Sequence, residues 1–324
     1  MILALVEHDR GKPNPLSLEA LTFGRRLAER ADVPLHAVLI GSEARPLADL
    51  SAAYGASMVH LVTHERLADF APAAWAQSVV EVVDAVAPEA VLGAGSDRGN
   101  EVMAHVAAKI GLAMAANCVE VEPREPYVVT RLRWGGSLLE EARLEGVPKL
   151  LTVAPHAVAA EEVSAAGEPA VETLTPALED EDLRVRVMGR TEAAEGRVSL
   201  PEARVVVGGG RGVGSADGFA MLEELASLLG GTVGVSRVVT SLGWRPHAEQ
   251  VGQTGTRIAP DLYIACGISG AIQHMVGCKA AKQILAINTD PEAPMVAKAD
   301  YAVIGDLRAV VPAVITEIKK ALDG

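Results

Sequence analysis

Short apolar segments alternate with amphipathic segments along the first 110 residues of the chain. The apolar segments have the length of buried strands, and between them apolar residues recur at helical spacing. Strands are predicted at 2–8, 34–41, 58–64 and 90–96, and helices at 16–31, 72–87 and 101–110. This alternation favours a doubly wound parallel sheet whose strands are joined by right-handed helical crossovers.

After residue 118 the pattern changes to short strand-like segments with few residues between them. These segments span 118–123, 127–134, 137–144 and 148–155. They predict an antiparallel extension of the sheet, with a turn at Gly135-Gly136. The stretch 157–182 is acidic and rich in alanine and proline, which is typical of a solvated linker. Residues 183–190 are expected to form a last strand of this domain or a bridge to the next.

The strand–helix alternation then resumes on a smaller scale. Strands are predicted within 203–214, 231–237, 262–265, 284–287 and 302–307, and helices at 218–229, 269–278 and 309–322. We therefore expect an α/β protein of two domains: residues 1–190, including the acidic linker at about 157–182, and residues 200–324. A glycine-rich turn follows the strand at 203–214, but no GxGxxG dinucleotide fingerprint can be drawn through it.

Polar residues follow the predicted strands of the second domain, where each strand ends. These residues are Arg211, Ser236, Arg237, the segment 267–274, Asn288 and Asp306. Ligands of open α/β sheets bind outside the carboxyl ends of the strands, so these positions favour one crevice that holds a large polar ligand. Ser269 is predicted to cap a helix whose start would bind an anion. The alternative is an ordinary strand–helix–strand unit whose glycines serve only the turn.

A second glycine-containing turn, at Gly95–Asn100, allows two interpretations. Backbone N–H groups and Arg98 before a helix would suit a phosphate. Alternatively, the glycines only turn the chain, and Asp97 or Asn100 caps the helix that follows.

Composition narrows the classes of protein further. A formal charge of −13 argues against nucleic-acid binding and against an anionic membrane surface. The three cysteines show no CxxC spacing, so neither a disulfide framework nor a thiolate metal site is expected, and a reducing compartment fits best. The sequence contains no signal peptide and no apolar run that could cross a bilayer, so we expect a cytoplasmic protein without direct membrane insertion.

Four motifs in the second domain carry a resemblance to a known family. They are VGQTG at Val251–Gly255, LYIACGISGAIQH at Leu262–His274, AIN at Ala286–Asn288 and DPEAP at Asp290–Pro294. Together they resemble the flavin-binding signature of the alpha subunit of electron transfer flavoproteins. The resemblance covers nearly all of 204–322 and is looser in the first domain. Trp134, Ala154 and Ser241 stand where the family has other residues.

This resemblance implies a nucleotide-binding-like first domain, which holds no AMP of its own, and a doubly wound FAD-binding second domain. The positions that match the family's FAD-contacting residues are Arg211, Ser236, Arg237, Val251, Gly252, Gln253, Thr254, Ser269, Gly270, Ala271, Ile272, Gln273, His274, Asn288, Asp306 and Leu307. The pyrophosphate is expected at the start of the 269–278 helix. Asn288 or Asp306 is expected to bind the adenosine or ribityl hydroxyls.

At the flavin ring, the resemblance implies three residues that tune the cofactor. Arg237 and His274 are expected to stabilise negative charge on the reduced ring, and Thr254 to bond its N5. One charge about 4 Å from another is worth about 4 kcal/mol at an effective dielectric constant near 20. Such a charge moves a one-electron potential by on the order of 100 mV.

The expected function is therefore electron carriage rather than turnover of a substrate. The resemblance implies a heterodimer with an electron transfer flavoprotein beta subunit, which holds AMP. Such proteins accept electrons from acyl-CoA or related dehydrogenases of fatty acid β-oxidation and pass them to a quinone oxidoreductase. The alternative within the family is an electron-bifurcating complex, whose beta subunit holds a second FAD that exchanges electrons with NADH.

Two rivals from other classes agree less well with the sequence. An NAD-dependent enzyme would require the missing GxGxxG fingerprint and a nucleophile–base pair, for which the sequence offers no candidate. A nucleotide-binding signalling module would leave the second domain unexplained.

Overall fold

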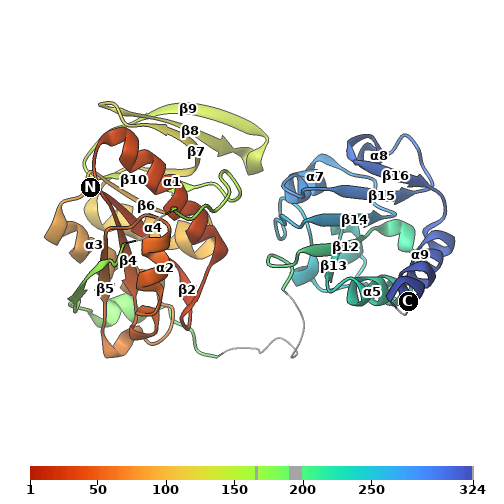
Figure 1. The fold of residues 1–324 in the computed structure, drawn as a ribbon, viewed down its shortest axis with the longest axis horizontal. Coiled ribbons are helices and arrows are strands. Elements are labelled where there is room, and N and C mark those ends of the chain that lie inside the picture. Colours follow the sequence, from red (N-terminus) through yellow and green to blue (C-terminus); the bar gives the residue numbers. More distant parts are fainter. Residues whose placement is uncertain (165–166, 190–198, 323–324) are drawn as a thin grey trace. The chain divides into compact units, whose positions relative to one another are not determined.

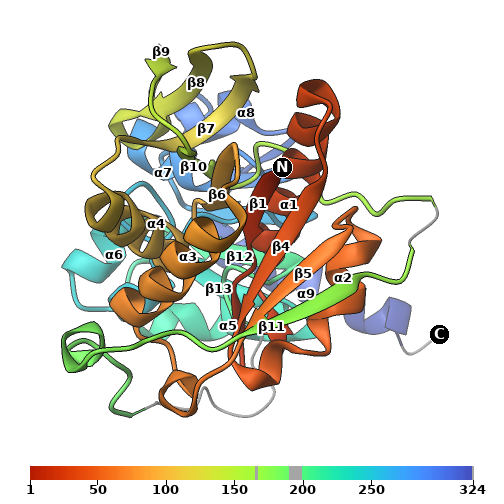
Figure 2. The same cartoon turned by 90° about the vertical axis from the view of Figure 1, so that its left-hand side faces the viewer.

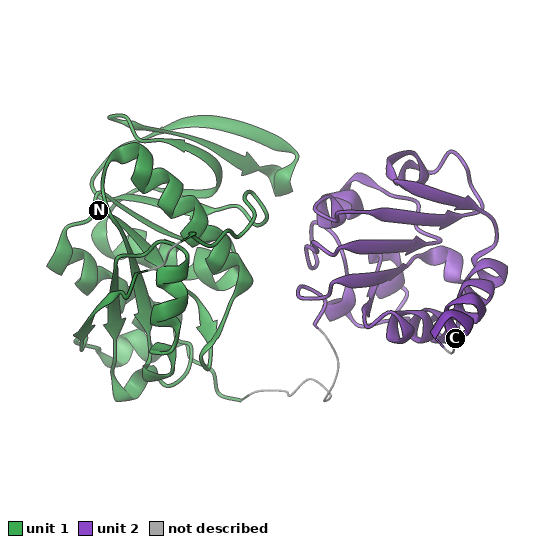
Figure 3. Cartoon of the chain, viewed as in Figure 1, with its two compact units in different colours: residues 1–190 green, residues 191–324 purple. Residues whose placement is uncertain are grey.

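A computed structural model describes residues 1–164, 167–189 and 199–322 of the chain. The chain forms two compact units, Met1–Arg190 and Thr191–Gly324, each with its own sheet (Figure 3). The sequence therefore predicted the α/β class correctly.

The first unit is built on a nine-stranded sheet in the order β11-β5-β4-β1-β6-β10-β7-β8-β9 (Figures 1 and 2). Its strands are β1 (Ile2–Leu5), β4 (Leu35–Ile40), β5 (Met58–Val62), β6 (Ala90–Ala94), β7 (Met114–Glu122), β8 (Tyr127–Arg133), β9 (Leu138–Leu144), β10 (Lys149–Val153) and β11 (Ala170–Leu174). Its helices are α1 (Pro15–Ala31), α2 (Leu47–Ala53), α3 (Pro72–Val86) and α4 (Asp97–Ile110). A short hairpin joins β2 (His8–Asp9) to β3 (Lys12–Pro13).

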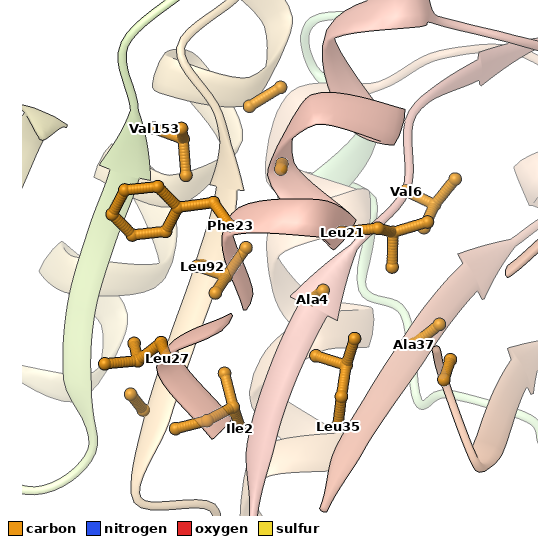
Figure 4. Packing of buried hydrophobic residues seen from close by; sticks show 14 of the residues in the cluster. Ile2, Ala4, Val6, Leu21, Phe23, Leu27, Leu35, Ala37, Leu92 and Val153 are labelled. Atoms are coloured by element: carbon orange, nitrogen blue, oxygen red, sulfur yellow. The ribbon is translucent and has the colours of Figure 1, made fainter. Parts of the chain in front are cut away.

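Two aliphatic cores cover the two faces of this sheet. On one face, α1 contributes Phe23 and Leu27, which pack among Ile2, Leu92 and Val153 of the strands (Figure 4). The other face packs against α3 and α4. Both faces are buried, which explains why the central strands are continuous apolar runs rather than alternating ones.

The segment 148–155 was predicted to extend the antiparallel region, and this prediction is wrong. Strand β10 instead pairs in parallel with both β6 and β7, inside the sheet. All five of its residues are buried, whereas β9 at the sheet edge is largely exposed. A short, fully buried strand belongs in the middle of a parallel sheet. Strands β7, β8 and β9 do form the expected antiparallel extension.

The interpretation of 157–182 as a solvated linker is also wrong. Strand β11 lies within it and pairs in parallel with β5 at the edge of the sheet (Figure 2). The acidic run that follows is partly engaged in ion pairs, because Asp182 binds Lys109 at 2.8 Å and Asp180 binds Arg66 at 2.6 Å. Residues 184–189, predicted as part of a last strand, contain no strand; residue 190 lies outside the described residues.

The second unit has a five-stranded parallel sheet in the order β13-β12-β14-β15-β16 (Figure 1). Its strands are β12 (Val205–Gly209), β13 (Thr232–Val235), β14 (Leu262–Cys266), β15 (Ile284–Asn288) and β16 (Tyr301–Ile304). Its helices are α5 (Ala220–Leu228), α6 (Arg237–Ser241), α7 (Ile272–Cys278), α8 (Pro294–Lys298) and α9 (Leu307–Leu322). Helices α5 and α9 pack on one face of the sheet, and α7 and α8 on the other.

The strand order of the second unit determines where a ligand would bind. The chain runs from β12 to one neighbour, β13, and then crosses to the other neighbour, β14. The crevice outside the carboxyl ends of β12 and β14 is therefore the topological switch point, where open α/β sheets bind ligands.

Across the described residues, no helix is long and apolar enough to cross a membrane.

Candidate flavin site

The loops after β12 and β14 meet at the switch point through direct backbone contacts. Gly212 N–H donates to the Gly267 carbonyl at 3.1 Å, and Gly210 N–H donates to Cys266 at 2.9 Å. A Cβ on Gly210 would lie 2.1 Å from the Gly267 oxygen, so only glycine allows this approach. The contact brings Arg211 of the first loop beside the segment 267–270.

The VGQTG loop packs against helix α7 in the same manner. Gln253 N–H donates to the Gln273 carbonyl at 2.8 Å, and Ile258 N–H donates to Gly277 at 2.8 Å. A Cβ on Gly277 would lie 2.3 Å from the backbone nitrogen of Gly252. Two separate predicted stretches, 251–254 and 273–274, therefore form one continuous wall.

Helix α7 begins three residues later than predicted. Its first residue is Ile272 and Ala271 stands at the cap position, so the prediction that Ser269 caps the helix is wrong. Gly270 has a φ of 82°, which interrupts the helix, and a Cβ there would lie 2.4 Å from the nitrogen of Met295. The Ser269 carbonyl accepts from Met295 N–H at 3.1 Å, so this segment is held by α8.

The side chains of Asn288 and Asp306 partly serve to shape the loops. The Asn288 amide donates to the Ile268 carbonyl at 3.0 Å and accepts from Asp290 N–H at 3.1 Å. One Asp306 oxygen accepts from Arg308 N–H at 2.9 Å, at the start of α9. Each side chain keeps further hydrogen-bonding capacity, so the predicted contacts with ligand hydroxyls stay a prediction.

Two buried polar atoms at the carboxyl ends of the strands, Ser236 Oγ and His274 Nδ1, have no partner in good hydrogen-bond geometry, although the backbone of Val251 lies close enough to act on the His274 ring. Both side chains are more than nine-tenths buried, so leaving these atoms unpaired costs about 1–3 kcal/mol each. Arg211 and Arg237 are exposed, and no carboxylate of the described residues forms an ion pair with either. A bound molecule with acceptor atoms and negative charge would satisfy all four residues, and FAD fits that description.

The charge state of His274 in the ligand-free protein bears on how its side chain would act on a flavin. In the ligand-free protein, burial lowers the pKa of His274 to about 4, against the opposing effect of a hydrogen-bonding interaction with the backbone of Val251, so the ring is neutral at pH 7. Its Nε2 lies 2.8 Å from the hydroxyl of Tyr263 on β14. In this charge state His274 would act on a flavin as a hydrogen-bond donor through Nδ1 rather than as a cation, and its expected tuning role stays a prediction. Arg237 is left as the positive charge of the predicted pair.

Gln250 is a residue of the site that the sequence did not predict. Its amide bridges two hydroxyls, accepting from Thr240 on α6 at 2.7 Å and donating to Thr254 at 3.0 Å. Because the Thr254 oxygen accepts this bond, its own O–H is free to donate to a ligand. The only sequence signal is that Gln250 directly precedes the VGQTG motif.

We expect Gln250→Leu to destabilise the second unit by about 1–3 kcal/mol, because the Thr254 hydroxyl would lose its buried donor, whereas Thr240 keeps the Arg237 carbonyl as an acceptor. FAD affinity should fall as well, since Thr254 would no longer be oriented. Urea unfolding and FAD titration of the variant measure the two effects. Gln283→Leu, which changes an exposed glutamine of the same unit, is the control. Unchanged stability and affinity of Gln250→Leu would contradict this account.

In the first unit, the turn at 95–100 is not arranged for a phosphate. Ser96 caps α4 by accepting from Gly99 N–H at 2.8 Å, so the cap is neither Asp97 nor Asn100. The Ser96 hydroxyl donates to the buried carboxyl of Glu7 at 2.6 Å. An acidic group next to the start of the helix occupies the position that an anion would take, so the interpretation as a turn and cap holds.

Comparison with known proteins agrees with this geometry. The "Electron transfer flavoprotein domain" family matches residues 2–179, and the "Electron transfer flavoprotein FAD-binding domain" family matches residues 199–279. The chain belongs to the electron transfer flavoprotein alpha subunit family. The match to the FAD-binding domain family includes both loop contacts described above and supports flavin binding by the second unit.

Curated relatives cover nearly the whole chain. The electron transfer flavoprotein subunit alpha of Thermoanaerobacterium thermosaccharolyticum is 34% identical, over 98% of this chain and 98% of its own. The subunit alpha of Mycobacterium tuberculosis is 39% identical, over 100% of this chain and 99% of its own. Protein FixB of Clostridium saccharobutylicum is 36% identical, over 99% and 97%. The resemblance predicted from the motifs is thus confirmed.

Proposed function

We propose that this electron transfer flavoprotein alpha subunit is an electron carrier without substrate turnover of its own. It accepts electrons from acyl-CoA or related dehydrogenases and delivers them to a quinone oxidoreductase. The observation that carries the proposal is the group of donors at the switch point that lack an ion-pair or hydrogen-bond partner among the described residues, namely Ser236 Oγ, His274 Nδ1 and the exposed side chains of Arg211 and Arg237. FAD, when bound, supplies the electron chemistry.

Some residues of the site would bind the cofactor, and others would adjust the redox potential of its flavin ring. We infer that Arg211, Ser236, Asn288 and Asp306 bind the polar parts of the cofactor, together with the backbone of 251–254 and 269–273. Leu307 packs against the loop after β14, since a Cβ on Gly267 would lie 2.8 Å from its side chain. Thr254 donates to the flavin ring, and Arg237 supplies positive charge near it.

We also propose that the chain works as a heterodimer with an electron transfer flavoprotein beta subunit in the cytoplasm. The names of its relatives, "subunit alpha", support a second subunit. In the carrier form the beta subunit holds AMP; in a bifurcating form it holds a second FAD. A reductive titration of the co-purified subunits separates these forms. One FAD per heterodimer that NADH does not reduce supports the carrier, and two flavins with direct reduction by NADH support bifurcation. A colourless complex that cannot take up FAD would contradict both.

Arg237→Ala should lower the midpoint potential of bound FAD. The loss of a positive charge near the ring disfavours the added electron, by on the order of 100 mV at low salt. Because Arg237 is exposed, added salt should reduce the difference between the variant and the wild type. Spectroelectrochemical titration measures this shift. The matched control is Arg204→Ala, an exposed arginine that binds Asp261 beside the opposite end of β12. An equal potential in both variants would remove Arg237 from the tuning role.

A further inference from the structure

Tyr263 and His274 form a buried pair that no function described so far explains. Tyr263 lies on β14 with none of its surface exposed, and its hydroxyl is 2.8 Å from His274 Nε2. The two rings are stacked, with centroids 6.1 Å apart. Gly208 on β12 makes room for the phenol, because a Cβ there would lie 2.3 Å from the Tyr263 oxygen. This one hydrogen bond therefore depends on three elements: β14 carries Tyr263, α7 carries His274, and β12 leaves space for the phenol at Gly208.

The direction of the hydrogen bond follows from the chemistry of the two groups. Burial raises the pKa of Tyr263 well above 10 and lowers that of His274 to about 4, so both are neutral at pH 7. Across the described residues, His274 is the sole hydrogen-bond partner of the Tyr263 hydroxyl. Tyrosine must donate its proton to satisfy it, and Nε2 is the acceptor within reach. A ring that accepts at Nε2 carries its proton on Nδ1.

We propose that Tyr263 is a positioning residue that fixes the tautomer of His274, so that Nδ1–H points as a donor to an acceptor atom of the bound flavin ring. This inference depends on the proposed flavin site. Beside the VGQTG loop, Nδ1 interacts with the backbone of Val251 but makes no bond of good hydrogen-bond geometry there, and the proposal explains why this donor is left for a ligand. It gives His274 the role of a hydrogen-bond donor whose bond to a flavin acceptor would strengthen as that acceptor gains negative charge.

Two substitutions of His274 test which nitrogen faces the flavin. The amide nitrogen of asparagine can take the place of Nδ1, whereas that of glutamine reaches the place of Nε2. We expect His274→Asn to bind FAD within about 3-fold of the wild type and His274→Gln to bind about 10-fold more weakly or worse. Titration of the complex with its beta subunit measures both affinities. The reverse order would overturn the proposal.

The tautomer itself is measured without flavin, by long-range ¹H–¹⁵N NMR of the full chain labelled at histidine. His274→Asn assigns the signal by removing it. We expect Nδ1–H in the wild type and in a Tyr127→Phe control, which removes the other fully buried tyrosine hydroxyl. Tyr263→Phe should show both tautomers and bind FAD about 3- to 10-fold more weakly. An Nε2–H signal in the wild type, or an unchanged tautomer in Tyr263→Phe, would refute the role of Tyr263. If neither the wild type nor any variant binds FAD while the expected tautomers are present, the proposed flavin site is refuted and the role of Tyr263 is not.

Discussion

Gly277→Ala is expected to weaken FAD binding by on the order of 100-fold and to lower the melting temperature of the second unit. A Cβ at this position would lie 2.3 Å and 2.4 Å from the backbone nitrogen and Cα of Gly252. Because the overlap is with backbone, the VGQTG loop must move away from α7. The hydrogen bonds of Gln253 and Ile258 that join loop and helix would lengthen. Losing two such bonds and the alignment of Thr254 accounts for up to about 3 kcal/mol of binding free energy.

The sign of the stability change depends on two opposing effects. Glycine to alanine inside a helix stabilises by about 0.5–1 kcal/mol. Overpacking against backbone costs about 1–3 kcal/mol, so the overlap wins and the melting temperature falls by several degrees. Gly189→Ala is the control, since a Cβ there meets nothing within 4 Å and its φ is not in the left-handed region. A variant Gly277→Ala that melts higher and binds FAD normally would mean that the loop does not contact α7 in solution.

His274 is expected to make the second unit less stable as the pH falls from about 6.5 to 4. Its pKa is about 4 in the folded protein and near 6.5 when exposed, so the unfolded chain takes up a proton first. The stabilisation is complete above pH 6.5 and is lost progressively down to the folded pKa. A difference of this size corresponds to about 3 kcal/mol.

Urea unfolding at several pH values, followed by the fluorescence of Trp244, measures this effect. Trp75→Phe and Trp134→Phe in the background leave Trp244 as the single reporter, and it lies in the second unit. His274→Asn removes the titrating group but keeps a polar side chain, so the difference between the two pH profiles isolates His274. Parallel profiles would show that the ring is not buried as described.

Much of the site could be predicted because parallel strands end together at one edge of a sheet. Arg211, Ser236 and His274 are far apart in sequence, yet each follows a strand and thus reaches the same edge. The glycines that allow close backbone contact, such as Gly252 and Gly270, stand in the motifs themselves. The alternation of strands and helices therefore predicts that the site lies at the carboxyl ends of the strands.

What could not be predicted depends on contacts between elements. Tyr263 lies in an apolar run and has the pattern of a core residue, so its bond to His274 becomes visible only when β14 and α7 are packed together. Strand β11 is almost fully exposed and is held by backbone pairing with β5, so it lacks the hydrophobic pattern that marks a strand. The position of β10 was missed because the sequence shows only a short apolar run, which can form a strand of either kind of sheet, and its burial on both faces becomes visible only in the fold.

The insertion of β10 has a consequence for the synthesis of the chain on the ribosome. When residues up to β9 have been made, β6 and β7 still lack the strand that joins them, and two edges of the sheet stay open. Residues 149–153 close both edges at once, and residues 170–174 then cover the far edge at β5. Open edges pair readily with other chains, so the nascent first unit is most prone to aggregation before these two late strands emerge.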